Sequence, residues 1–225
     1  AAQGKEFWMH ELQSGSYGIG LEIPEKKLSG ERVAGWAWTT ISQGAKGLLF
    51  WQYRTEQFGA EYGFNLVNLD GTPNERLKAA AKIGETLRSN ESLFEQLKPV
   101  EPEVAIGYSP MNPMMLYVAD GNIEPFDNSY LGIYRLLSHL SIPSIDIVRL
   151  DAQVVDDDFS KYKVLYMPLP LWLDEETSLK IEKFVRQGGL VVAEPSLAFI
   201  ETDYFSADIV PGMGLSKVFG CRREH

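Results

Sequence analysis

The chain has 225 residues, of which 44% are hydrophobic and 23% are charged, a composition typical of a globular protein. Its formal net charge of -10 disfavours binding to nucleic acid and to anionic membranes, because both require cationic patches on the protein. No apolar run approaches the roughly 20 residues needed to cross a bilayer, so we expect no membrane partner. A single cysteine, Cys221, excludes an internal disulfide and a cysteine-based metal cluster.

The cysteine content also favours a reducing compartment, the cytoplasm, although a secreted protein without disulfides remains an alternative. Residues 1–6 have neither the basic nor the apolar region of a signal peptide, and the chain does not open with methionine. We therefore expect a fragment of a longer protein.

The first part of the chain alternates strand and helix patterns. We predict strands over residues 7–11 and 47–53, the second as a continuous apolar run typical of a sheet buried on both faces. Residues 30–43 carry apolar side chains at helical spacing, with Trp36 and Trp38 expected to pack. Another helix is predicted from Thr72-Pro73-Asn74-Glu75 to about Arg88, with Thr72 as its cap and Pro73 as its first residue.

Residues 98–103 combine two prolines with acidic residues, which predicts an extended linker between two domains. Beyond the linker, strand patterns cover residues 104–108, 145–150, 164–168 and 190–194, and helix patterns cover residues 128–140 and 174–187. The order strand, helix, strand, strand, helix, strand indicates a parallel, doubly wound sheet.

Polar and aromatic residues follow the two strands of the first part. In a barrel of alternating strands and helices, functional groups lie at the carboxyl ends of the strands and on the following loops. Glu11 ends the first strand, Trp51, Tyr53 and Arg54 end the second, and Glu61 lies in the loop beyond. Aromatic platforms beside two carboxylates are typical of glycoside hydrolysis. Spacing alone leaves this open, because a glutamate at a strand end is more often a solvated surface residue, and Trp51 fits a core position as well as a sugar subsite.

Several segments, in this order, resemble the β-galactosidases of glycoside hydrolase family 42. Residues 7–15 (FWMHELQSG) are similar to the nucleophile strand of that family, residues 32–45 to its next helix, and residues 50–54 (FWQYR) to its last barrel strand. Past the linker, the segments that resemble the family's trimerisation domain are residues 104–108, 130–140, 162–168 and 184–189.

The resemblance implies an α/β fold class: the C-terminal part of a TIM (β/α)8 barrel followed by a doubly wound, glutamine-amidotransferase-like (flavodoxin-like) domain. The expected domains are residues 1–97 for the barrel units, 98–103 for the linker, and 104–225 for a truncated trimerisation-like domain. The expected partners are a carbohydrate substrate and two further copies of the chain in a homotrimer.

On this resemblance, Glu11 is the nucleophile of a retaining glycosidase, ionised at working pH because hydrogen-bond donors hold its pKa low. Trp51, Tyr53, Arg54 and Glu61 contact the sugar. The general acid, expected about 5–5.5 Å from the nucleophile, lies on an earlier strand of the family, so we expect this chain alone to be inactive.

The sequence departs from the family at two places. Tyr62, Gly63 and Phe64 fill a stretch in which the family usually has a histidine, which leaves the bound sugar open. His10 is not typical of the family, and it either contacts a sugar hydroxyl or points into the packing. No cofactor is expected. No metal is expected either, since Asp156-Asp157-Asp158 fits a solvated turn better than a cation site.

Residues 104–225 are open to two other functions. A true amidotransferase needs a nucleophilic Cys or Ser on a Gly-flanked turn with a His base. The corresponding strand ends instead in Glu194-Pro195-Ser196, and the last histidine before His225 is His139. A module without catalysis, serving subunit association, fits these residues better and is compatible with the glycosidase hypothesis.

Overall fold

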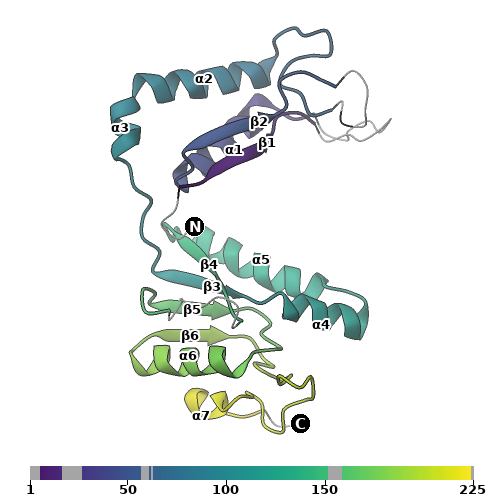
Figure 1. The fold of residues 1–225 in the computed structure, drawn as a ribbon, viewed down its shortest axis with the longest axis vertical. Helices are drawn as coiled ribbons and strands as arrows, with labels where there is room; N and C mark the ends of the chain where they lie inside the picture. The colour runs from purple at the N-terminus through teal and green to yellow at the C-terminus, as the bar shows by residue number, and fades with distance from the viewer. Residues whose placement is uncertain (1–5, 17–26, 57–60, 62, 152–158, 224–225) are drawn as a thin grey trace. The chain divides into compact units, whose positions relative to one another are not determined.

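A computed structural model describes residues 6–16, 27–56, 61, 63–151 and 159–223 (Figure 1). The chain divides into two compact units, Ala1–Pro99 and Val100–His225. Among the described residues, every helix is too short or too polar to cross a lipid bilayer.

The described residues of the first unit form two parallel strands and three helices. Its elements, in chain order, are β1 (Trp8–Gln13), α1 (Gly30–Ser42), β2 (Gly47–Trp51), α2 (Glu75–Ser89) and α3 (Glu91–Gln96). The two predicted strands and the two predicted helices are therefore confirmed, whereas α3 was not predicted. A strand, a helix and a parallel neighbouring strand form the repeating unit of a barrel of this class.

The two longer helices of this unit start at side-chain caps. The Ser29 hydroxyl accepts a hydrogen bond from the N–H of Arg32 and begins α1. The prediction that Thr72 caps the next helix is wrong, and so is the placement of Pro73 inside it. The amide oxygen of Asn74 accepts from the N–H groups of Arg76 and Leu77, while the Thr72 hydroxyl donates to Asp70 instead.

One face of the β1–β2 pair is covered by helices. Side chains on this face form a cluster with Ala37 of α1 and Ile83 of α2, and they are Met9, Leu12, Leu48 and Phe50. Trp36 and Trp38 pack against the same cluster, as predicted. The opposite face of the two strands exposes large apolar side chains, among them Trp8, Leu49 and Trp51. A parallel sheet normally has both faces covered by other elements. Among the described residues of this unit, only one face of the β1–β2 pair is covered.

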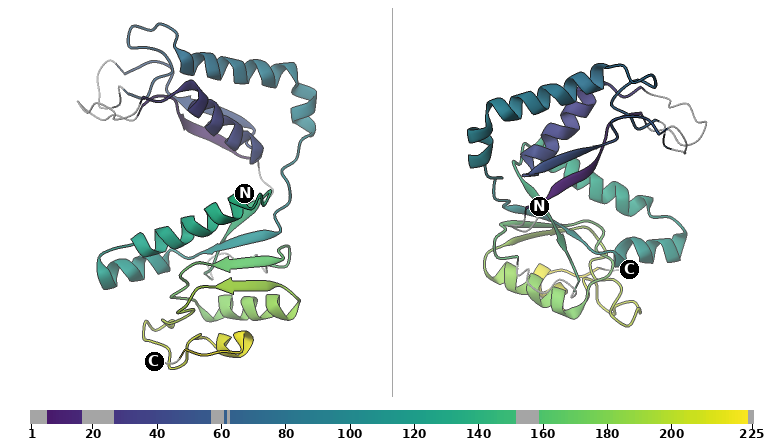
Figure 2. Two further views of the ribbon diagram at one scale, coloured as in Figure 1. Left: turned by 180° about the vertical axis from the view of Figure 1, so that it is seen from behind. Right: turned by 45° about the horizontal axis from the view of Figure 1, so that its top comes forward.

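The second unit is a four-stranded parallel sheet with helices on both faces (Figures 1 and 2). Its elements are β3 (Val104–Tyr108), α4 (Met111–Asp120), α5 (Glu124–His139), β4 (Ile145–Arg149), β5 (Val164–Met167), α6 (Glu175–Arg186), β6 (Leu190–Ala193) and α7 (Leu215–Phe219). The strand order β4-β3-β5-β6 is the flavodoxin-like order. The second strand of the unit, β4, lies on one side of the first strand, β3, and the later strands β5 and β6 lie on its other side. The prediction of a parallel, doubly wound sheet is confirmed.

The two faces of this sheet have separate cores. Leu137 of α5 packs with Val104 and Ile106 on one face, and Ile181 and Phe184 of α6 pack on the other face in a larger cluster. Since each strand alternates its side chains between the faces, the continuous apolar runs found in the sequence supply both cores at once.

Candidate active site

Glu11 lies on the uncovered face of the first unit. The strand register pairs Met9 with Leu48 but Leu12 with Phe50, so β1 carries one residue more than β2 between these pairs. This bulge breaks the alternation of side chains, and His10 and Glu11 are both exposed. Glu11 was expected at the strand end, but it lies within the bulge, before the last two residues of β1.

The Glu11 carboxylate has no hydrogen-bond or ion-pair partner among the described residues. The expected shell of donors around it is therefore not present in the described part of this chain. The reason is geometric, because the helices cover the other face of the strands and leave this face open. His10 does not point into the packing. Its ring contacts the ring of Trp8 edge to face, with centroids 6.4 Å apart.

Trp51 and Glu61 are brought together by the structure. The indole Nε1–H of Trp51 donates to Oε2 of Glu61 over 3.0 Å. Trp51 is 38% exposed in this chain and is not part of the cluster between the two strands and the helices. The strands β1 and β2 are parallel, and Gln13 at the end of β1 pairs with Trp51 at the end of β2. The Trp51 ring and Glu61 therefore lie at the carboxyl end of the sheet, where the strand that carries Glu11 also ends.

The side chains of Tyr53 and Arg54 are exposed. Tyr53 takes part in the local structure through its carbonyl, which accepts from the N–H of Val67. Neither side chain is held against Glu11 or Glu61 by a hydrogen bond. Tyr62 and the Asp156–Asp158 run lie outside the described residues. Elsewhere, no group of three or more metal-binding side chains comes together in the described part of the chain.

Several buried residues near this site were not predicted, namely Ser14, Asn65 and Arg76. The Ser14 hydroxyl donates to the Gln52 carbonyl over 2.9 Å, and Arg76 donates to the Asn65 carbonyl. One signal in the sequence was available: an arginine in the first turn of a helix opposes the positive end of the helix dipole, so another interaction must favour it.

An apolar groove of about 710 Å³ lies elsewhere in the first unit. It borders Gly47 and Leu48 at the amino end of β2, and the stacked rings of Trp38 and Phe94 line it. Functional groups in barrels of this type gather at the carboxyl ends of strands, so we place the candidate site at Trp51 and not in this groove.

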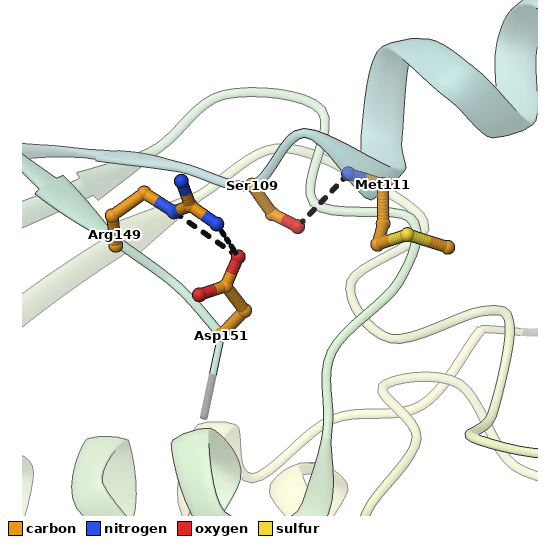
Figure 3. Close-up of polar contacts among 4 residues, drawn as sticks. All are labelled: Ser109, Met111, Arg149 and Asp151. Atoms are coloured by element: carbon orange, nitrogen blue, oxygen red, sulfur yellow. Dashed lines mark hydrogen bonds and ion pairs between the residues drawn. The ribbon is translucent and has the colours of Figure 1, made fainter. Parts of the chain in front are cut away.

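A second polar cluster follows the strands of the second unit (Figure 3). Arg149 donates from Nε and Nη2 to one oxygen of Asp151, at 3.1 and 2.5 Å. The buried Ser109 hydroxyl accepts from the N–H of Met111 over 3.3 Å. The cluster contains no histidine and no cysteine, so it lacks the imidazole base and the thiol that an amidotransferase would use.

The turn after β6 also lacks amidotransferase chemistry. The Glu194 carboxylate accepts from the Ser129 hydroxyl over 2.5 Å and from the N–H of Leu169 over 3.0 Å. The Ser196 hydroxyl accepts from Arg223, not from a histidine. The geometry of the described residues thus gives the amidotransferase alternative no nucleophile–base pair.

Two family models match the chain. The β-galactosidase model of glycoside hydrolase family 42 matches residues 1–90, and the β-galactosidase trimerisation domain matches residues 132–225. Relatives include β-galactosidase GalA of Bacillus licheniformis, 26% identical over 157 residues, and β-galactosidase GanA of Bacillus subtilis, 28% identical over 158 residues. Each match covers 68% of this chain and 22% of the relative, so the chain spans about a fifth of their length.

Solved structures show the same fold. The β-galactosidase from Bacillus circulans sp. alkalophilus superposes with a TM-score of 0.80 at 20% identity, over 95% of this chain and 31% of that chain. The β-galactosidase from Halorubrum lacusprofundi superposes with a TM-score of 0.78 at 20% identity, over 98% and 32%.

These matches define the class of fold: the C-terminal part of a TIM barrel followed by a doubly wound α/β domain. The resemblance to the β-galactosidases of glycoside hydrolase family 42 is confirmed for both parts of the chain, the barrel units and the trimerisation domain.

Proposed function

We propose that this chain is part of a retaining glycoside hydrolase that acts on β-galactosides or related β-glycosides. The observation that carries the proposal is the Trp51–Glu61 hydrogen bond at the carboxyl end of β2. It combines an aromatic platform at the end of β2 with a carboxylate from the following loop, and β2 is the strand that pairs with the Glu11 strand. The match of residues 1–90 to the β-galactosidase model supports the proposal.

In this mechanism, the Glu11 carboxylate attacks the anomeric carbon, the bond from that carbon to the aglycone oxygen breaks, and the aglycone leaves with a proton from the general acid. Water then hydrolyses the glycosyl-enzyme ester, which releases the sugar and restores the Glu11 carboxylate. Trp51 stacks on the sugar ring, and Glu61 accepts hydrogen bonds from its hydroxyls. Tyr53, Arg54 and His10, which are all exposed, are further sugar contacts in this proposal. The general acid belongs to polypeptide outside this chain, so the 225-residue chain alone is inactive.

The second unit, with the linker at residues 98–103 before it, serves subunit association in a homotrimer in this proposal. The match of residues 132–225 to a trimerisation domain supports it. A cytoplasmic location fits the single cysteine of the chain.

The first test replaces Glu11 with Gln in the complete protein that contains this chain. We expect kcat on an aryl β-galactoside to fall by at least about a thousandfold, because the glutamine amide cannot form the glycosyl ester. Glu6→Gln, which changes an exposed glutamate just before β1, serves as the matched control and should keep its activity. Full turnover by Glu11→Gln would remove Glu11 from the mechanism.

A further inference from the structure

The segment that follows Glu61 is seated against the end of β2 by backbone hydrogen bonds. The N–H of Gln52 donates to the Phe64 carbonyl over 2.5 Å, and the N–H of Leu66 donates to the Gln52 carbonyl over 2.9 Å. The N–H of Phe64 in turn donates to the Glu61 carbonyl over 3.4 Å. The position of Glu61 beside Trp51 therefore depends on how residues 63–67 are held.

Arg76 also holds this segment, through its side chain. Its side chain is 7% exposed, and Nε and Nη2 both donate to the Asn65 carbonyl, at 3.1 and 2.9 Å. Asn65 is itself buried and donates from its amide to the Val67 carbonyl over 2.6 Å. The guanidinium thus makes two hydrogen bonds to one carbonyl in the middle of the segment.

This placement of a charge is energetically unfavourable by itself. Burial lowers the pKa of the Arg76 guanidinium, and the nearby Glu75 charge opposes that effect without forming an ion pair among the described residues. An arginine at the second position of α2 also faces the positive end of the helix dipole. Since a leucine or methionine would fill the site without these costs, the two hydrogen bonds to Asn65 are the interaction that favours arginine here.

The residues after β1 contact this segment directly at Gly63, and they also bond to Gln52, which itself pairs with the segment. Ser14 is fully buried, and its hydroxyl donates to the Gln52 carbonyl. A Cβ atom added to Gly15 would lie 2.0 Å from the Gly63 carbonyl oxygen, so the two backbones are in direct contact. The segment is therefore clamped between the end of β1 and the start of α2.

We propose that Arg76 is a positioning residue, which acts through the Asn65 carbonyl to hold Glu61 against the Trp51 indole. The inference rests on the proposed function for its meaning, because Trp51 and Glu61 are the groups that would contact the sugar. Arg76 itself touches neither of them, and its effect is exerted through residues 63–67.

The test uses the 15N–1H spectrum of the 225-residue chain, in which the Trp51 indole N–H is assigned from the signal lost in Trp51→Phe. Glu61→Gln gives the position of that signal without the carboxylate. We expect Arg76→Met to move the signal most of the way to the Glu61→Gln position, because Asn65 is released. Arg88→Met, which removes an exposed arginine from the last turn of the same helix, should leave the signal in place.

Arg76→Lys decides the matter if Arg76→Met does not fold, as judged by circular dichroism. The lysine keeps the charge but not the fork, so we expect a shift smaller than that of Glu61→Gln but clearly resolved. A native Trp51 signal in a folded Arg76 variant would overturn the inference. The Trp51 signal does not depend on hydrolysis. If the proposed glycosidase function were wrong, a shifted Trp51 signal would still show that Arg76 positions Glu61. If the signal did not shift, the glycosidase proposal would be unaffected.

Discussion

The ring of Tyr130 lies among other aromatic rings on one face of the second unit. Its ring stacks on Phe126 with centroids 5.8 Å apart and meets Tyr108 edge to face at the same distance. Burial, together with the neighbouring Tyr108, raises the pKa of Tyr130 to about 12. The folded state therefore keeps this proton at a pH where the unfolded chain, with a pKa near 10, has released it.

This difference predicts an alkaline loss of stability. A pKa raised on folding contributes stability that is complete below about pH 10 and is lost as the pH rises toward 12, because the unfolded state is then the one that deprotonates. Tyr130 is partly exposed, so we expect a loss of at most about 2 kcal/mol. Urea unfolding at pH 9 and pH 11.5 should show this loss in the native chain and a smaller loss in Tyr130→Phe. An equal loss in both would assign the effect to other tyrosines.

At the scale of elements, the strands were more predictable from the sequence than the helices. A parallel strand with both faces buried is a continuous apolar run, and Val104–Tyr108 was predicted with its observed bounds. Helix α4 was missed because Pro113 lies in its first turn and no side chain caps it. The five-residue α7 is too short to show a helical period.

The shared edge of the expected site residues was predictable from the sequence, but their contacts were not. Parallel strands bring their carboxyl ends together, so Glu11 and Trp51 could be assigned to one edge from the sequence. The hydrogen bond between Trp51 and Glu61, by contrast, depends on a loop path fixed by Arg76, and neither hydrophobic period nor turn chemistry reports such a path.

The start of α2 tests the corrected cap. Asn74→Ala leaves the N–H groups of Arg76 and Leu77 without their side-chain acceptor, and we expect a loss of about 1 kcal/mol. Thr72→Ala should cost less than about 0.5 kcal/mol, because Thr72 is exposed and does not cap the helix. Urea unfolding, followed by tryptophan fluorescence, measures both. A larger loss for Thr72→Ala would restore the cap predicted from the sequence.

At the scale of the whole molecule, the two units differ in how completely their sheets are covered. The four-stranded sheet has a core on each face, whereas the β1–β2 pair has one on the helix side only. The uncovered side carries Trp8, Leu49 and Trp51 as exposed groups. That contrast fits a chain that spans about a fifth of its β-galactosidase relatives, because the interior face of a barrel is covered only when further strands close it.

The proposed trimer makes a prediction that involves the charge of the whole chain. Each copy carries a formal charge of -10, so three copies repel one another, and salt weakens that repulsion. Sedimentation velocity of the 225-residue chain at tens of micromolar should therefore give about three times the 25.3 kDa chain mass, with dissociation on dilution that is stronger at 20 mM than at 300 mM salt. Sedimentation as a 25.3 kDa monomer at both salt concentrations would count against an assembly role for the second unit. A mass of about three chains whose dissociation grows with salt would instead mean that ion pairs between copies outweigh their net repulsion.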